Sequence, residues 1–103
     1  MNINFLTNQT EYNPGETVLV EGTATKENGQ SADGFVDLLF VPFNSSQNIT
    51  YKGTLNNGFF SISFVLPKDT KAEKYLLSLN AYEKNANNET TNTGFATYKI
   101  GVN

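Results

Sequence analysis

Apolar and polar residues alternate with a period of two along most of the chain. In the clearest case Phe60, Ile62 and Phe64 share one side of a segment, and Ser61 and Ser63 share the other. This alternation is typical of a β-strand with one buried face. No window shows a helical period. The pattern predicts strands over residues 3–7, 17–25, 35–43, 49–55, 60–66, 75–81 and 96–102.

Turn residues separate these segments. Asn28-Gly29 and Asn57-Gly58 each lie between two strand-like runs. The Asn-Gly pair readily adopts the positive φ angles of a tight β-hairpin turn, so both are expected to join paired strands. A third pair of strands surrounds a polar, Asn-rich loop at 83–92. The chain is therefore predicted to be all-β, a seven-stranded antiparallel β-sandwich with one domain over residues 1–103.

Composition and charge restrict the partners. Hydrophobic residues make up 38% of the chain, including eight Phe and five Tyr, so a packed core is expected. Ten acidic residues oppose seven basic ones, all lysine, and the net charge is −3. No segment is basic enough to follow a phosphate backbone, so we expect no nucleic-acid partner. No apolar run approaches the roughly 20 residues that cross a bilayer, so we expect no membrane insertion by this domain.

The first residues have neither the charged nor the apolar region of a signal peptide. This leaves two expectations, a cytosolic protein or a fragment of a longer precursor. We favour the fragment, taken from a larger surface protein.

Residue types that most catalytic and metal sites need are missing. The sequence contains no His, Cys or Arg. This excludes Ser-His and Cys-His nucleophiles and zinc sites built on thiolate or imidazole. Asp33 and Asp37 would lie about 13 Å apart in an extended strand, too far for a catalytic carboxylate pair. We therefore predict a protein that is not an enzyme, with no catalytic residues, no cofactor and no metal site.

The polar loop at 83–89 carries oxygen ligands, which Ca²⁺ prefers, and is therefore a candidate calcium site. It contains Glu83 and Glu89 with Lys84 between them, and it lacks the Asp-x-Asp spacing of dedicated calcium loops. The favoured interpretation is a solvated hairpin loop, with a calcium site as the alternative.

Four Asn-x-Ser/Thr sequons provide candidate glycosylation sites in a secreted protein. All four fall in predicted loops or at strand ends. Their asparagines are Asn8, Asn44, Asn48 and Asn88.

An apolar cluster is predicted on the outward side of the third strand. It comprises Phe35, Leu39 and Val41, with Phe59 and Val65 as additional members. An exposed apolar patch of this kind indicates contact with a partner or a neighbouring domain. The alternatives are that loops or the N-terminal strand cover it, or that the inward face is reversed.

The order of these turns and strands follows a known pattern. The segments that carry it are YNPGETV at 12–18, GFVDL at 34–38, GFFSISFVLP at 58–67, YLLSLNA at 75–81 and GFATYKIGV at 94–102. In this order the chain resembles the immunoglobulin-like and fibronectin-III-like modules of prokaryotic surface proteins, with a macroglobulin-like pattern. It departs from antibody-type domains because it has no cysteine pair and no tryptophan.

The resemblance implies an immunoglobulin-like module, extracellular or on the cell surface, that serves as a non-catalytic spacer or adhesive unit beside neighbouring domains of the same chain. It also likens Tyr75 to a tyrosine corner, whose hydroxyl bonds to upstream backbone, with an ordinary core aromatic as the alternative. The second functional hypothesis is a carbohydrate- or protein-binding module. It would use the aromatic face or the loop at 82–92, where Tyr82 lies near Asn85 and Asn87.

Overall fold

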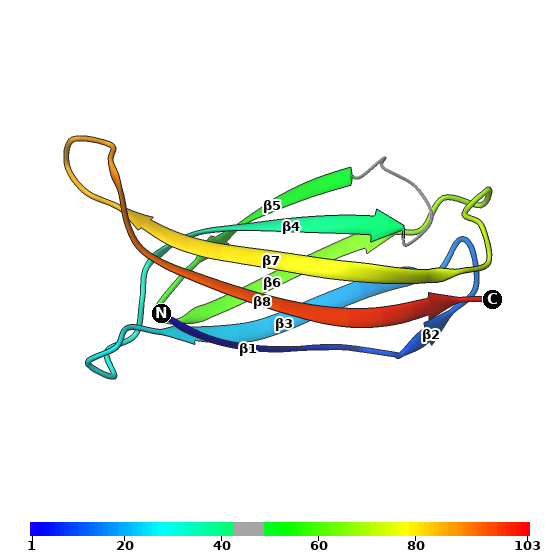
Figure 1. Cartoon of the computed structure of the whole chain (residues 1–103), viewed down its shortest axis with the longest axis horizontal. Coiled ribbons are helices and arrows are strands. Elements are labelled where there is room, and N and C mark those ends of the chain that lie inside the picture. Colours follow the sequence, from blue (N-terminus) through cyan, green and yellow to red (C-terminus); the bar gives the residue numbers. More distant parts are fainter. Residues whose placement is uncertain (43–48) are drawn as a thin grey trace.

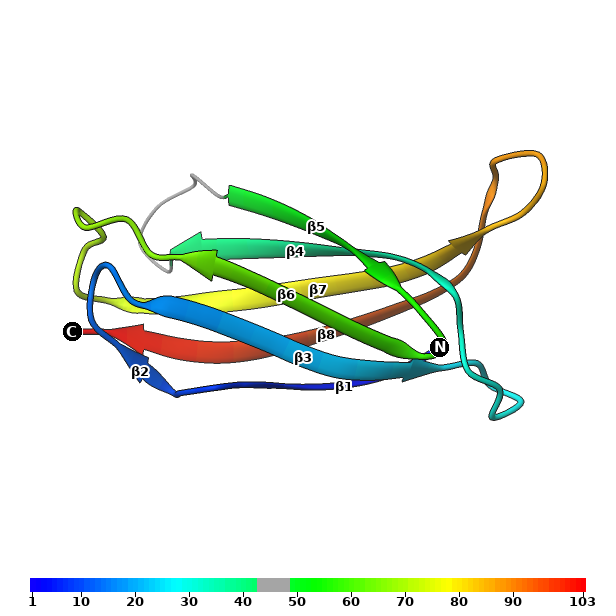
Figure 2. The same cartoon turned by 180° about the vertical axis from the view of Figure 1, so that it is seen from behind.

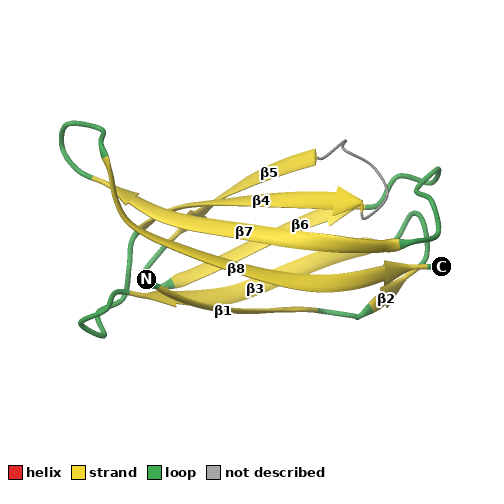
Figure 3. Cartoon of the chain, in the orientation of Figure 1, coloured by secondary structure: helices red, strands yellow, loops and turns green. Residues whose placement is uncertain are grey.

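The computed structural model describes residues 1–42 and 49–103 and is built from β-strands (Figures 1 and 3). The described residues contain no helix, and so none that is long and apolar enough to cross a membrane. The all-β prediction is confirmed. The strands are β1 (Asn2–Thr7), β2 (Glu11–Tyr12), β3 (Thr17–Thr25), β4 (Gly34–Pro42), β5 (Ile49–Leu55), β6 (Phe59–Val65), β7 (Lys74–Lys84) and β8 (Thr90–Val102).

The strands form two sheets that lie one over the other (Figures 1 and 2). One sheet has three strands in the order β1-β3-β6, and the other has five in the order β2-β8-β7-β4-β5. All ladders are antiparallel except that of β2, which runs parallel to β8 through the pairs Glu11↔Gly101 and Tyr12↔Val102. The described architecture is thus a mixed, sandwich-like arrangement. It has one strand more than predicted because a two-residue strand shows no alternation in the sequence.

The two Asn-Gly turns form, but they do not join paired strands as expected. Asn57 and Gly58 have φ angles of 53° and 83°, and they close only one bridge, Asn56↔Phe59, before β5 and β6 enter different sheets. The Asn28-Gly29 turn also leads from one sheet to the other, from β3 to β4. An Asn-Gly pair determines a local chain reversal, whereas the ladder beyond it depends on which strands bury apolar faces side by side. Both hairpin predictions are therefore wrong in their pairing.

The pair predicted around the Asn-rich loop is present. Strands β7 and β8 form a long antiparallel ladder with a register shift at Tyr82/Glu83. At the loop tip, Asn85 Oδ1 accepts hydrogen bonds from the backbone N–H groups of Asn87 and Glu89 at 2.9 and 3.0 Å. The Asn85 amide thereby closes the turn.

The core lies between the two sheets and takes alternate side chains from both. Phe40 of the five-stranded sheet contacts Phe64 of the three-stranded sheet, with ring centroids 5.5 Å apart. Tyr75 stacks on Phe40 at 4.5 Å, and Tyr51 stacks on Phe64 at 4.2 Å. The other fully buried core side chains include Val18, Val20, Val36, Leu38, Leu55, Leu66, Leu77, Leu79 and Ile100.

Two buried tyrosines bind nearby loops through their hydroxyl groups. The Tyr75 hydroxyl donates to the Lys71 carbonyl at 2.9 Å, which is the upstream backbone contact expected of a tyrosine corner. The Tyr12 hydroxyl donates to Asn8 Oδ1 at 2.6 Å and accepts from the Gln9 N–H at 3.1 Å. The residues that follow Tyr12, Asn13-Pro14-Gly15, are typical of a turn, so the sequence gives no sign that Tyr12 itself is buried.

The described molecule is elongated, with principal-axis extents of 42 × 24 × 17 Å. The strands run along the long axis, and the N- and C-termini lie toward opposite ends of the sheets (Figures 1 and 2).

Candidate ligand-binding site

The outer face of the five-stranded sheet carries three of the predicted interface residues. Strand β4 lies between β5 and β7, and its alternation turns Phe35, Leu39 and Val41 away from the core. Phe35 is 42% exposed, while Leu39 and Val41 are half-buried among neighbouring side chains. The exposed part of this face is therefore at the Phe35 end of the strand.

Phe35 has an aromatic neighbour on the adjacent strand. Tyr82 of β7 stands directly opposite Phe35 in the ladder. The two rings stack, with centroids 5.7 Å apart and planes at 30°. The two regions that the sequence offered as alternative binding surfaces, the aromatic face and the segment beginning at Tyr82, thus meet at one point.

Charged groups adjoin this aromatic pair. Asp37 lies two residues beyond Phe35 on the same side of β4, and Lys52 stands opposite it on β5. Lys52 Nζ is 3.9 Å from Asp37 Oδ1. Burial raises the pKa of the Tyr82 hydroxyl, and the negative charge of Asp37 with a hydrogen bond to it raises that pKa further. The Tyr82 hydroxyl is therefore neutral at physiological pH.

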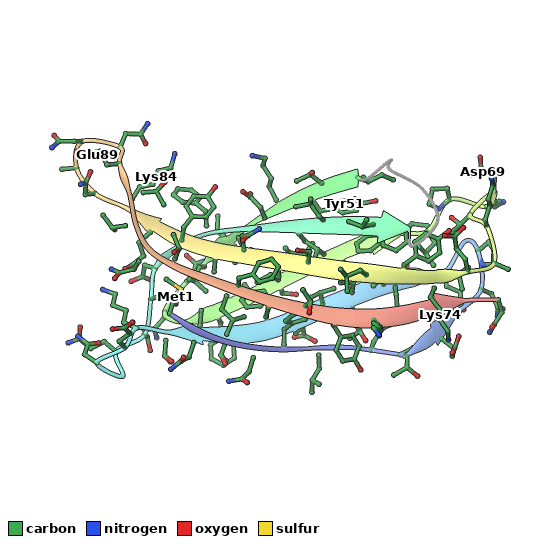
Figure 4. All side chains as sticks on the ribbon, viewed as in Figure 1. Met1, Tyr51, Asp69, Lys74, Lys84 and Glu89 are labelled. Atoms are coloured by element: carbon green, nitrogen blue, oxygen red, sulfur yellow. The ribbon has the colours of Figure 1, made fainter. Side chains whose placement is uncertain are left out.

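Together these groups line a shallow hollow of about 190 Å³. Its lining residues are Phe35, Asp37, Lys52, Gly53, Tyr82 and Lys84. Lys84 reaches it from the end of β7, near the β7–β8 loop (Figure 4). Aromatic rings beside a few charged and hydroxyl groups suit a small polar ligand that also has an apolar face.

Phe59 and Val65 do not belong to this face. Both are on β6, in the three-stranded sheet, where they are 68% and 61% exposed. The predicted patch is therefore divided between the two outer faces of the molecule. Sequence alternation shows that a side chain points outward, but it does not show from which sheet.

The four sequons fall in different surroundings. Asn44 and Asn48 lie outside the described residues. Asn88 is exposed in the β7–β8 loop and has a positive φ of 62°. Asn8 is also exposed, but its amide is engaged: Nδ2 donates to the Thr17 carbonyl at 3.3 Å, and Oδ1 accepts from the Leu19 N–H at 3.1 Å. Asn8 thus has a structural role at the end of β1, whether or not it is modified.

Glu83, considered above as a calcium ligand, is the centre of a hydrogen-bonded network. Its carboxylate accepts from Asn92 Nδ2 at 2.8 Å and from the Asp33 N–H at 3.3 Å, and Lys26 Nζ lies 3.4 Å away. Burial alone would raise the pKa of Glu83, but the hydrogen bonds from these groups and the charge of Lys26 outweigh it and lower the pKa. Within the part of the chain that the structure describes, no three His, Cys, Asp or Glu side chains gather as a metal site would require.

Comparisons with known proteins bear on the fold. No family model and no curated protein matches the chain. Among solved structures, the chain is similar to Spo0M, a sporulation control protein from Bacillus subtilis, with a TM-score of 0.54 and 16% sequence identity. The likeness covers 97% of this chain and 48% of the Spo0M chain, so the present chain spans about half the length of that structure. At this identity, the likeness shows the fold alone.

These findings correct the family resemblance inferred from the sequence. The solved structure named above is Spo0M, a sporulation control protein and not an immunoglobulin-like or fibronectin-III-like surface module, and no family model supports such a module. The segments behind the inference are Pro-Gly and Asn-Gly turns beside alternating strands, which a two-sheet domain of any family can contain. They indicate an all-β architecture and do not distinguish one family from another.

Proposed function

We propose that this domain is a non-catalytic structural module that holds whatever precedes and follows it at a fixed separation. The observation that carries the proposal is the course of the chain: the strands lie along the 42 Å axis, and the termini lie toward opposite ends. In this proposal the longer, antiparallel strands act as one rigid β-sandwich, and β2 adds a short parallel pair at its edge. A spacer or adhesive role in a secreted or cell-surface protein is part of the proposal.

The packing of the core supports a structural role. Among the described residues, every buried side chain belongs to the apolar core. No buried side-chain nitrogen or oxygen in this part of the chain lacks a hydrogen-bond partner. A fully satisfied, close-packed interior resists deformation, as a spacer requires.

The separation of the two ends tests the proposal. The sequence has no cysteine, so Asn2→Cys and Asn103→Cys allow labels to be attached at two chosen exposed sites. Distances between the labels, measured by pulsed electron spin resonance, should form one narrow distribution, unchanged when folded proteins are fused to both ends. A broad distribution in native buffer, like that of the denatured chain, would show that the domain cannot act as a spacer.

The hollow favours a second function, the binding of a carbohydrate. The apolar face of a sugar ring can stack on the Phe35–Tyr82 pair while its hydroxyl groups bond to Asp37 and Lys52. Protein ligands remain the other class that this surface suits.

Chemical-shift titration with a panel of mono- and oligosaccharides tests the binding function. A binding sugar should shift the amide signals around Phe35 and Tyr82, and Phe35→Ala should weaken binding at least about tenfold, equivalent to about 1.4 kcal/mol. Phe59→Ala is the matched control because it removes an exposed ring from the opposite face. Equal effects of the two substitutions would contradict binding at the hollow.

A further inference from the structure

Strand β6 forms an open edge of the three-stranded sheet. It pairs with β3 on one side, and within the described residues no ladder adjoins its other side. The neighbour along the chain, β5, belongs to the other sheet and forms no backbone ladder with β6. The two strands meet through the core side chains Tyr51 and Phe64, and the turn between them closes the bridge Asn56↔Phe59. An unpaired strand edge is a template for pairing with another strand.

The backbone groups that face this open edge follow from the pairing with β3. Ala24 N–H donates to the Gly58 carbonyl, and Leu66 N–H donates to the Glu16 carbonyl. Even-numbered residues of β6 therefore direct their backbone groups toward β3, because direction alternates along a strand. The odd-numbered residues Ser61 and Ser63 consequently present their N–H and C=O groups to the open edge.

The sequence of β6 is close to a palindrome. In the sequence FFSISFV, Ile62 has a serine on each side and then a phenylalanine on each side. The outermost residues, Phe59 and Val65, are the two that differ. An antiparallel pair of identical strands centred on Ile62 would set Ser61 opposite Ser63 of the other copy. Both of these residues present backbone groups to the edge, so each such pair can exchange two hydrogen bonds.

The outer-face side chains match in the same register. Phe59 of one copy would stand opposite Val65 of the other, and an aromatic beside a β-branched side chain is a favourable cross-strand pair. Both are among the most exposed large apolar residues of the described chain, at 68% and 61%. The pairing would partly cover both.

Other strand edges carry features that discourage pairing, and β6 does not. Strand β5 carries Lys52, β2 is two residues long, and β1 lies close to β8, with the N-terminal amine donating to the Thr93 carbonyl at 3.2 Å. Strand β6 has seven residues without a charge or a proline. Lysine, proline and short length are the usual protections of an edge.

We propose that β6 is a self-association edge, at which a second copy of this chain adds its own β6 antiparallel and in register at Ile62. The two three-stranded sheets then become one continuous sheet with two-fold symmetry. The interface is isologous because the same strand serves both copies.

Charge substitutions at the edge test both the contact and its register. Sedimentation over a concentration series should show a monomer–dimer equilibrium for the unmodified chain. The double variant Ser61→Lys/Ser63→Lys places lysines opposite each other across the two-fold axis. The dissociation constant of its dimer should therefore be at least tenfold higher. Ser61→Glu/Ser63→Glu should weaken the dimer in the same way. A mixture of the lysine variant and the glutamate variant should form a dimer again, because opposite charges then face each other.

Asn2→Lys/Asn4→Lys is the control, since it adds the same charges to the other edge strand of the same sheet and should leave the equilibrium unchanged. Thermal melting checks that each variant is folded, which is expected because Ser61 and Ser63 are exposed. A monomer at every concentration would overturn the proposal. The proposal would also be overturned by a dimer whose dissociation constant is unchanged in Ser61→Lys/Ser63→Lys, or by a mixture of the lysine and glutamate variants that stays monomeric.

Discussion

At the scale of single residues, polar side chains connect loops that come from distant parts of the sequence. Glu83 joins the β3–β4 connection to the β7–β8 hairpin through Asp33, Lys26 and Asn92. The Tyr75 hydroxyl holds the loop before β7 through Lys71. The resemblance drawn from the sequence offered this contact of Tyr75, with an ordinary core aromatic as the alternative. It gave no sign of the Glu83 network, whose partners lie in segments far apart along the chain.

Glu83 should make stability depend on pH. The pKa of Glu83 in the folded state is lowered from the usual 4.5. The ionised carboxylate therefore stabilises the fold above pH 4.5, and this stabilisation is lost as the pH falls through the folded-state pKa. Glu83→Gln should cost about 1–2 kcal/mol near neutral pH, and less in acid. Urea unfolding at a series of pH values measures this. Glu89→Gln, at the exposed loop (Figure 4), is the control, and a cost for Glu83→Gln that stays constant with pH would refute the explanation.

Removal of the Tyr75 hydroxyl should destabilise the fold. Tyr75→Phe leaves the Lys71 carbonyl without its partner and should cost about 0.5–1.5 kcal/mol in the free energy of unfolding. Tyr98→Phe provides the comparison, because Tyr98 packs through its ring against Phe5 and should tolerate the change. Equal unfolding free energies for the two variants would show that the corner hydrogen bond contributes nothing.

At the scale of elements, the sequence predicted the longer strands well and their pairing less well. Alternation located strands such as β6, where inward Phe and Ile positions are separated by serines. It could not reveal β2, which is too short to alternate. The Asn-Gly turns were recognised from local chemistry, but the choice of sheet after each turn depends on contacts across the whole domain. For the same reason the apolar patch was predicted as one surface, whereas Phe35 and Phe59 lie on opposite faces.

The two Asn-Gly turns should differ in their tolerance of a side chain. Gly29 and Gly58 both have positive φ angles, 86° and 83°. The backbone strain of an alanine at either position should therefore cost about 1 kcal/mol. A Cβ at Gly29 would meet nothing within 4 Å, whereas at Gly58 it would lie 3.2 Å from Ser31 Cβ and 3.3 Å from the Ala24 carbonyl oxygen. Gly58→Ala should therefore lower the melting temperature more than Gly29→Ala. The reverse order would contradict the close packing of the β5–β6 turn.

At the scale of the whole molecule, the two sheets depend on one shared core. The three-stranded sheet contributes side chains such as Phe64, and the five-stranded sheet contributes Phe40 and Tyr75. Both outer faces are then available for contacts, the hollow on one and the β6 edge beside the other. The sequence indicated the separate parts of the candidate site but not that they come together. Phe35 and Tyr82 are 47 positions apart and meet through the β4–β7 ladder.

The shared core is tested most directly by a double-mutant cycle across the two sheets. Phe40→Leu and Phe64→Leu, made singly and together, should show a coupling of about 0.5–1.5 kcal/mol in the free energy of unfolding, because their rings are in contact. Phe35 and Phe59 lie on opposite outer faces, so the effects of Phe35→Ala and Phe59→Ala on the free energy of unfolding should be additive to within about 0.5 kcal/mol. Strict additivity of the Phe40 and Phe64 substitutions would show that the sheets do not pack as described, and the proposed rigid module would lose its physical basis.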